Sequence, residues 1–509
     1  MRDTVEWSQD LRGMPMAVDW NQLSMRAGKG SFIRFVIPAH FDPAALPEIV
    51  MGLRRQLDAG GSLRYQRFPS DEFLPHIGRH LDLGATAIDA DRLLGSFWEV
   101  TGLAMDGMTL PFDGWTCSIR GADERSKAGI PFAIAAPQLA IFRSGIAFVS
   151  VEVRPVRDDP RDWFDLAHFM RFMTPGRERP LSHPDVPNGA TISSLLEATA
   201  SVVRLAHDRP FDVLVDDVGT GDRAALSLGA FTVSECMIYG SVYLDGAPTE
   251  QMAELRERAR SGFHSKQGDS VVNPSALGSE HQHRLAYQEG QTFELGLSAS
   301  VFVGFDMPDS QFSAQNLPAH LREVYFVLFE LVHAQRLALS TLSDDVFEVV
   351  ASATSRQGVL KLADILDHIV ELDRQLLDFT GSSSFLQVTH QHHHHWYYSK
   401  LRELVQVENF YREVKDEVAT LRFYVSSLVQ REEDRRANVL QIAVTAMSAI
   451  FVPAGVLLTL FQPQIPRWPG LHELSPMAST LITLFILGIT STVLWSMSAL
   501  LRRRGRSRR

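Results

Sequence analysis

Two long uncharged runs near the C-terminus decide the fold class of this chain. Residues 439–461 read VLQIAVTAMSAIFVPAGVLLTLF, and residues 477–501 read MASTLITLFILGITSTVLWSMSALL. Each run is long enough to cross a bilayer core of about 30 Å as a helix that rises about 1.5 Å per residue. The segment between them, 462–476, is rich in proline and glycine, so it turns the chain. The pattern predicts a two-helix transmembrane hairpin with a short external loop.

Arginines flank this hairpin on one side only. The tail 502–509 holds six arginines, and Arg431, Arg435 and Arg436 precede the first run, whereas the connecting loop holds only Arg467. Basic residues stay on the cytoplasmic side of a membrane. We therefore expect a multi-pass protein of the plasma (inner) membrane, with both termini and the basic tail in the cytoplasm.

The composition narrows the classes of partner and chemistry. The formal net charge is −11, which argues against nucleic acid as a partner and is compatible with gathering cations. Two cysteines, Cys117 and Cys236, are too few for a disulfide framework and fit a reducing compartment. The chain has no phosphate-binding glycine loop and no recognisable catalytic constellation. We expect neither an enzyme nor a required cofactor.

The region before the hairpin changes character near residue 316. Residues 1–315 mix alternating apolar runs such as 31–41 and 138–153 with a helical period over 161–173. They predict a cytoplasmic α/β domain with a partly antiparallel sheet. Residues 316–395 are rich in apolar residues at helical spacing, including an amphipathic helix over 359–379, and predict a cytoplasmic helical segment.

A long helix is expected to connect this part to the membrane. From Trp396 the chain has no glycine or proline until Pro453, so a stalk helix over 396–438 should continue into the first run. An apolar seam with heptad spacing runs along this helix. It consists of Leu404, Val407, Tyr411, Val414, Val418, Leu421, Val425 and Leu428. Such a seam requires a helical partner, either in another copy or in a bundle of the same chain.

Polar residues of the first run lie on one line at the same heptad spacing. The line consists of Asn438, Gln441, Thr445, Ser448, Val452, Gly455 and Thr459. Amides and hydroxyls are not satisfied by hydrocarbon, so they face protein or water. The pattern favours several copies around an axis, each presenting this line to a water-filled pore. The alternative is close helix packing through small and hydroxylated residues.

From Leu401 to the end, this layout resembles the CorA family of divalent-cation channels. That family has a large cytoplasmic α/β domain, a long stalk helix that becomes the first span, a short outer loop and a second span. Residues 450–453, Ile-Phe-Val-Pro, are similar to its apolar-Phe-Met-Pro segment. The resemblance implies a homopentamer that conducts Mg²⁺, Co²⁺, Ni²⁺ or Zn²⁺ passively through a pore lined by the first span. It also implies Asn438 at the inner mouth.

The outer end of the first span departs from the family pattern. Where the family has aromatic-Gly-Met-Asn, this chain has Phe461-Gln462-Pro463-Gln464. Gln462 or Gln464 could present amide oxygens to a hydrated ion in place of the asparagine. The departure also leaves open a ligand-gated nonselective membrane effector, or a membrane scaffold that transports nothing.

Two further groups are candidates for regulatory metal binding. His390 and the run His392, His393, His394 and His395 precede the stalk, and imidazoles suit Zn²⁺, Ni²⁺ or Cu²⁺. Asp434, Glu417 and Glu413 lie along the stalk, where carboxylates around an axis would hold divalent ions. In both cases the alternative is a solvated segment without a ligand.

Overall fold

The computed structural model describes most of the chain before the hairpin. The described residues are 18–28, 30–66, 72–78, 80–82, 93–105, 108–119, 125, 128–135, 137–174, 176–206, 214–215, 226–228, 231–266, 283–354, 362–382, 385–460, 485 and 488. The chain divides into two compact units, Met1–Leu421 and Arg422–Arg509.

Strand β2 (Phe32–His40) lies at the centre of the sheet in the first unit. It pairs antiparallel with β11 (Ile146–Pro155) and with β17 (Met237–Asp245), and β17 runs parallel to β20 (Ala299–Phe305). The order along the sheet is β13-β12-β8-β9-β11-β2-β17-β20-β19-β18, and fifteen described strands belong to it. A strand buried on both faces reads as a continuous apolar run, as β2 does.

The remaining strands are short. Those of the main sheet are β1 (Ser24–Met25), β3 (Leu63–Tyr65), β4 (Leu81–Asp82), β5 (Gly95–Val100), β8 (Trp115–Cys117), β9 (Ile130–Ile134), β10 (Gln138–Phe142), β12 (Leu181–His183), β13 (Val186–Ala190), β18 (Arg284–Gln288) and β19 (Gln291–Leu295). Two small sheets contain β6 (Ala104–Met105) with β7 (Met108–Thr109), and β14 (Leu214–Val215), β15 (Leu226–Leu228) and β16 (Phe231–Val233).

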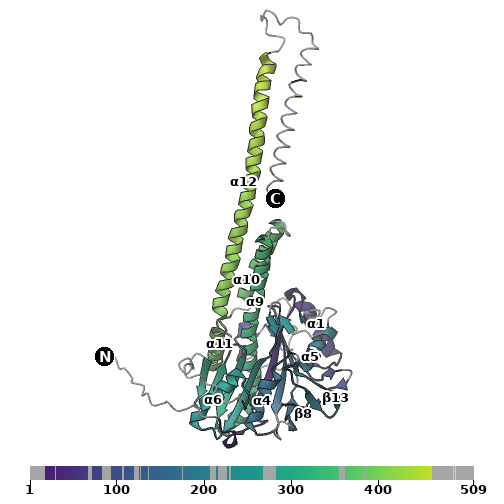
Figure 1. Cartoon of the computed structure of the whole chain (residues 1–509), viewed down its shortest axis with the longest axis vertical. Helices are drawn as coiled ribbons and strands as arrows, with labels where there is room; N and C mark the ends of the chain where they lie inside the picture. Colours follow the sequence, from purple (N-terminus) through teal and green to yellow (C-terminus); the bar gives the residue numbers. More distant parts are fainter. Residues whose placement is uncertain are drawn as a thin grey trace, which may run out of the picture. The chain divides into compact units, whose positions relative to one another are not determined.

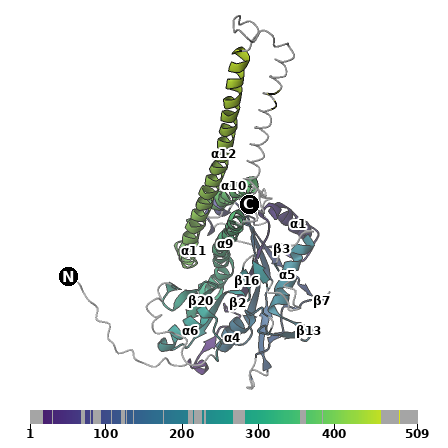
Figure 2. The same ribbon diagram turned by 45° about the horizontal axis from the view of Figure 1, so that its top comes forward.

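Helices cover both faces of the main sheet, as Figures 1 and 2 show. One face packs on α1 (Leu46–Asp58), α4 (Pro160–Met170), α5 (Ile192–Ala206) and α6 (Thr249–Ser261). The other packs on α9 (Phe326–Thr354) and α11 (His392–Leu404). Alternate residues of β2 serve the two cores: Ile33 and Phe35 face the first, and Phe32 and Val36 face the second. The first unit is therefore a three-layer α/β/α arrangement.

The patterns that predicted individual elements are confirmed in this unit. The run 31–41 contains β2, and the helical period over 161–173 corresponds to α4, which Asp159 caps and Pro160 begins. The predicted hairpin over 138–153 is β10 and β11, joined through Gly145 at a φ of 80°. Short helical segments complete the elements: η1 (Trp20–Gln22), η2 (Pro43–Ala45), α2 (Pro75–Gly78), η6 (Phe312–Asn316), α8 (Leu317–His320) and η7 (Leu321–Tyr325).

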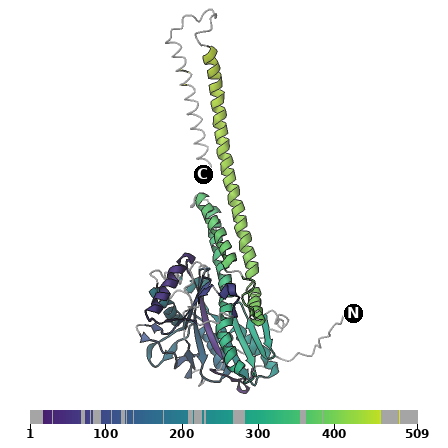
Figure 3. The ribbon, with the colours of Figure 1, turned by 180° about the vertical axis from the view of Figure 1, so that it is seen from behind.

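Long helices follow the sheet, and Figure 3 shows them from behind. They are α9, α10 (Leu362–Ser382) and α12 (Val407–Leu460), the last with 54 residues. The expected single helix from Trp396 is wrong in two respects, because helix begins at His392 and breaks at Val405 and Gln406. Gln406 has a φ of 57°, a left-handed conformation that ends α11 although no glycine or proline marks the position.

Candidate functional site

The first part of α12 packs within its own chain. Val407, Val414, Val418 and Leu421 of the predicted seam are buried. Tyr411 stacks on Phe379 of α10, with ring centroids 6.0 Å apart, and its hydroxyl lies 3.1 Å from Thr380 Oγ1. Of the two partners considered for the seam, the structure places this part against helices of the same chain.

The polar line occupies the described part of α12 in the second unit. Asn438, Gln441, Thr445 and Ser448 are all exposed. So are their apolar neighbours, since Leu440 is 65% exposed and Phe451 62%. Gly455 is exposed as well, whereas the side chains of Val452 and Thr459, and all of Gln462 and Gln464, lie outside the described residues.

The described residues include most of the first predicted membrane run and two positions of the second. Over the ranges that the structure describes, no helix has a stretch both long enough and apolar enough to span a bilayer. The predicted loop 462–476 lies outside those ranges, as does the second run 477–501 apart from positions 485 and 488.

The three acidic candidates of the stalk do not share one environment. Asp434 and Glu413 are exposed. Glu413 lies near Arg336 of α9, where its negative charge opposes the lowering of the arginine's pKa by burial. Glu417 is half-buried and accepts a hydrogen bond of 3.1 Å from Ser343 Oγ of α9. Glu417 therefore faces its own helical layer.

The predicted histidines separate into different environments. His390 and His392 are exposed, His393 and His395 are half-buried, and the His394 side chain is fully buried. His392 to His395 are consecutive on the first turn of α11, so their side chains point in different directions, and His390 precedes the helix. Only His394 points fully into the interior, and neither of its ring nitrogens has a hydrogen-bond partner.

Two residues that the sequence analysis missed lie beside His394. Its Nδ1 is 3.5 Å from Glu72 Oε2, and its ring centroid is 5.9 Å from that of His320 at the end of α8. Tyr325 meets the same ring edge-on at 4.7 Å. Burial, together with His393 and His320, lowers the pKa of His394 to about 3, so the ring is neutral at physiological pH.

Backbone contacts hold Glu72 in this position. Phe73 and Thr389 form an antiparallel bridge, the Leu74 amide donates to the Val388 carbonyl at 2.8 Å, and Thr389 Oγ1 donates to the Glu72 carbonyl at 2.6 Å. The pairing joins segments more than three hundred residues apart in the chain. No local pattern around Glu72 marks it, which is why only the histidine run attracted notice.

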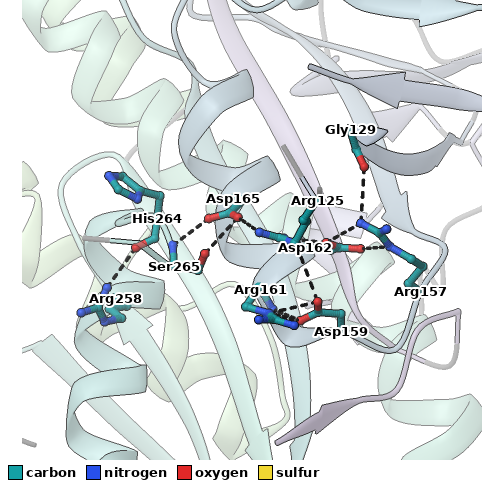
Figure 4. Close-up of polar contacts among 10 residues, drawn as sticks. All are labelled: Arg125, Gly129, Arg157, Asp159, Arg161, Asp162, Asp165, Arg258, His264 and Ser265. Atoms are coloured by element: carbon teal, nitrogen blue, oxygen red, sulfur yellow. Dashed lines mark hydrogen bonds and ion pairs between the residues drawn. The ribbon is translucent and has the colours of Figure 1, made fainter. Parts of the chain in front are cut away.

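A second polar cluster near the N-terminal end of α4 pairs two buried aspartates with arginines (Figure 4). Arg125 donates to Asp162 at 2.6 Å and to Asp165 at 2.5 Å, and Arg157 also donates to Asp162. The Ser265 amide and hydroxyl donate to Asp165 as well. Both aspartates are buried, and their oxygens are occupied by cations and donors. This cluster joins three segments of the chain, and its carboxylates are occupied by structural contacts.

A third cluster anchors the helical layer to the sheet. Glu152 of β11 accepts hydrogen bonds from Arg34 of β2 and from Arg322, both at 2.9 Å, and from Arg154 at 2.7 Å. Burial alone would raise the pKa of Glu152, but the three arginines outweigh it and hold the pKa at about 2. Glu152 thus stays charged and binds the segment that leads into α9.

Neither the placement of metal-ligating side chains nor the comparisons with known proteins assigns a family. Among the residues that the structure describes, no group of three or more His, Cys, Asp or Glu side chains is placed to hold a metal ion. A scan against protein-family models finds no match, and a search of the curated proteins finds none either.

Proposed function

We propose that this chain is a CorA-like, homo-oligomeric channel or transporter for divalent metal cations, in which copies surround an axial pore. The proposal assigns 439–461 and 477–501 to the plasma membrane as a hairpin, with the α/β unit and both termini in the cytoplasm. Five copies is the number that the family resemblance implies. Ions would move passively, down their electrochemical gradient.

One observation carries the proposal: a single helix contains both the packed seam and the exposed polar line. α12 continues without a break from Val407 to Leu460. From 430 to 451, every side chain except Ala446 and Ile450 is exposed. Apolar side chains exposed around a whole helix favour lipid or other chains as their surroundings. The polar line requires polar partners in that setting, and other copies with water between them supply such partners.

Each position on the line would act according to its chemistry. A ring of Asn438 amides would face hydrated ions at the inner mouth, and Gln462 or Gln464 would do so at the outer end. Mg²⁺ sheds its water reluctantly, so amide oxygens that bind the hydrated ion suit it. A ring of Val452 side chains would form an apolar constriction that closes by dewetting. Asp434, exposed next to the inner mouth, is the preferred carboxylate for regulation by cytoplasmic divalent ions.

The test is divalent-ion flux by the purified full-length chain in liposomes that contain an ion-sensitive dye. We expect Mg²⁺ or Co²⁺ entry that follows the gradient, and imaging of the particles should show copies around one axis with α12 facing it. Flux that appears only after a cytosolic ligand is added would support the ligand-gated effector. Complete absence of flux under either condition would contradict transport and leave the scaffold.

A substitution at the proposed constriction makes the test specific. Val452→Asn should raise the leak of divalent ions by about tenfold, because a polar ring keeps the constriction hydrated. Met447→Leu, which lies off the polar line, is the matched control and should leave flux unchanged. Equal flux in wild type and Val452→Asn would contradict the assignment of Val452.

A further inference from the structure

Two arginines that follow α4 share one carboxylate. Arg171 Nε is 3.4 Å from Glu235 Oε2, and Arg177 Nη1 is 3.7 Å from Glu235 Oε1. Both separations exceed the length of a charge-assisted hydrogen bond, which is about 2.7 to 2.9 Å. Arg171 Nε is buried and has no hydrogen-bond partner among the described residues. One negative charge therefore faces two positive charges, at distances that compensate them only weakly.

The two guanidinium groups lie against the same aromatic ring. The Cζ atom of Arg177 is 3.8 Å from the centre of the Phe172 ring, and that of Arg171 is 4.9 Å from it. Arg171 Nη1 also donates to the Ser261 carbonyl at 3.0 Å, so this side chain is held from the α6 side as well. These contacts keep two like charges close together, which favours an anion that can bind both.

Backbone pairing places Glu235 beside the arginines. Phe172 and Glu235 form an antiparallel bridge. The Cys236 amide donates to the Arg171 carbonyl at 2.7 Å. Arg171 is half-buried, whereas Arg177 and Glu235 are exposed enough for a ligand to reach them from solvent. The positions of the charges are thus set by the fold, and one side of the group stays open.

The local charge is positive although the chain is acidic. Residues 171–179 contain three arginines and one glutamate, whereas the formal net charge of the whole chain is −11. The glutamate, Glu178, accepts a hydrogen bond of 3.1 Å from a backbone amide of α5, so its carboxylate serves another segment. Burial lowers the pKa of Arg171, Glu235 opposes this shift, and the charge of Arg177 adds to it. A further negative charge would stabilise both guanidinium groups.

From this geometry we infer that Arg171 and Arg177 form a binding site for a phosphate group, and that the Glu235 carboxylate competes with this ligand. A phosphate group presents three acceptor oxygens and about two negative charges, whereas a carboxylate presents two oxygens and one charge. Arginine binds phosphate through parallel hydrogen bonds that are shorter than the contacts Glu235 makes. The site lies on the α/β unit and goes beyond the proposed transport, since it does not depend on the polar line of α12.

The test is isothermal titration calorimetry of inorganic phosphate into the purified full-length chain in detergent. We expect one phosphate per chain. The unfolding midpoint should also rise with phosphate concentration, because a ligand that binds only the folded state stabilises it. Sodium chloride at the same ionic strength should give neither effect. Binding is measured without ion flux, so failure of the proposed channel function would be recognised separately.

Substitutions then identify the binding groups. Arg171→Gln and Arg177→Gln should each weaken phosphate affinity about tenfold or more, because each removes charge-assisted hydrogen bonds. The Arg177 side chain is 59% exposed and that of Arg171 is 19% exposed, so Arg177→Gln decides the matter even where Arg171→Gln fails to fold. Arg161→Gln, at the opposite end of α4 and paired with Asp159, is the matched control and should bind as wild type does.

Glu235→Gln tests the competition directly. This substitution removes the negative charge that faces both arginines, so phosphate affinity should rise about fivefold. A glutamate that only holds the arginines in place would give the opposite result, because its loss would disorder the site and weaken binding.

A second titration distinguishes the two sources of a phosphate group. Dihexanoyl phosphatidic acid in the same detergent presents the group on a lipid headgroup. Affinity no higher than that of inorganic phosphate would assign a soluble phosphate compound to the site, and affinity at least tenfold higher, lost in Arg177→Gln, would assign a headgroup.

Three outcomes would overturn the inference. Absence of phosphate binding in both wild type and Glu235→Gln would exclude the site. Wild-type affinity in Arg177→Gln would show that phosphate binds elsewhere. Weaker binding in Glu235→Gln would contradict the competition.

Discussion

The two parts of α12 differ in how far their side chains are buried. Up to Leu421, the seam residues Val407, Val414, Val418 and Leu421 are buried by the chain's own helices, and polar groups such as Glu417 find partners there. From 430 to 451, apolar and polar side chains alike are exposed. The heptad spacing is the same in both parts, so the spacing alone does not reveal what a helix packs against. Burial distinguishes the two cases: a bundle helix is covered by other helices of its own chain, whereas a helix whose side chains stay exposed needs other surroundings.

The largest effect should come from a charge placed in the buried part. Val414→Asp puts a carboxylate without a cation into a site that is now fully buried, which should lower the free energy of unfolding by about 3 to 5 kcal/mol. Urea unfolding followed by tryptophan fluorescence measures it. Lys415→Asp, on the exposed side of the same turn, should change stability by less than about 0.5 kcal/mol. Similar effects of the two substitutions would break the comparison.

Acid should destabilise the attachment of the helical layer to the sheet, because this attachment depends on the charge of Glu152. The pKa of Glu152 is held at about 2, below the value of about 4.3 expected when unfolded. A carboxylate whose pKa is lower in the folded than in the unfolded state stabilises the fold at any pH above its unfolded pKa. This stabilisation is lost as the pH falls from about 4 towards 2. The loss should be on the order of 2 to 3 kcal/mol.

The pH dependence can be assigned to Glu152 by substitution. Unfolding midpoints measured between neutral pH and pH 2 should fall less steeply in Glu152→Gln than in wild type, although the variant begins less stable. Glu371→Gln removes an exposed carboxylate paired with Arg374 and serves as the control. An unchanged slope in Glu152→Gln would show that other carboxylates cause the acid sensitivity.

The exposed part should respond in function with little change in stability. Thr445→Val and Ser448→Val together remove two hydroxyls from the polar line, which should reduce divalent flux about tenfold by drying the path. Because both side chains are exposed in the single chain, the unfolding midpoint of the α/β unit should stay as in wild type. Unaltered flux in the double variant would favour helix packing over pore lining.

Local patterns predicted local structure well. Alternation gave β2 and the hairpin of β10 and β11, and the helical period gave α4, because these features depend on neighbouring residues. The break at Gln406 was missed, since glutamine rarely adopts positive φ and gives no signal. The pairing of Glu72 with His394 and the compensation of Asp162 by Arg125 were also missed, because each joins residues far apart in the chain. Whether the polar line faces a pore depends on what surrounds α12. The sequence of the helix indicates these surroundings only indirectly.

The turn at Gln406 makes the connection between α11 and α12 an elbow. Two residues replace what would be a stiff rod, and Arg402 spans the bend by binding Glu408 on the far side. A displacement of the histidine-bearing turn would therefore reach α12 as a change of angle, with the arginine as a brace that limits it. Holding a non-glycine residue in this conformation takes about 1 kcal/mol, so the bend is maintained by the contacts around it.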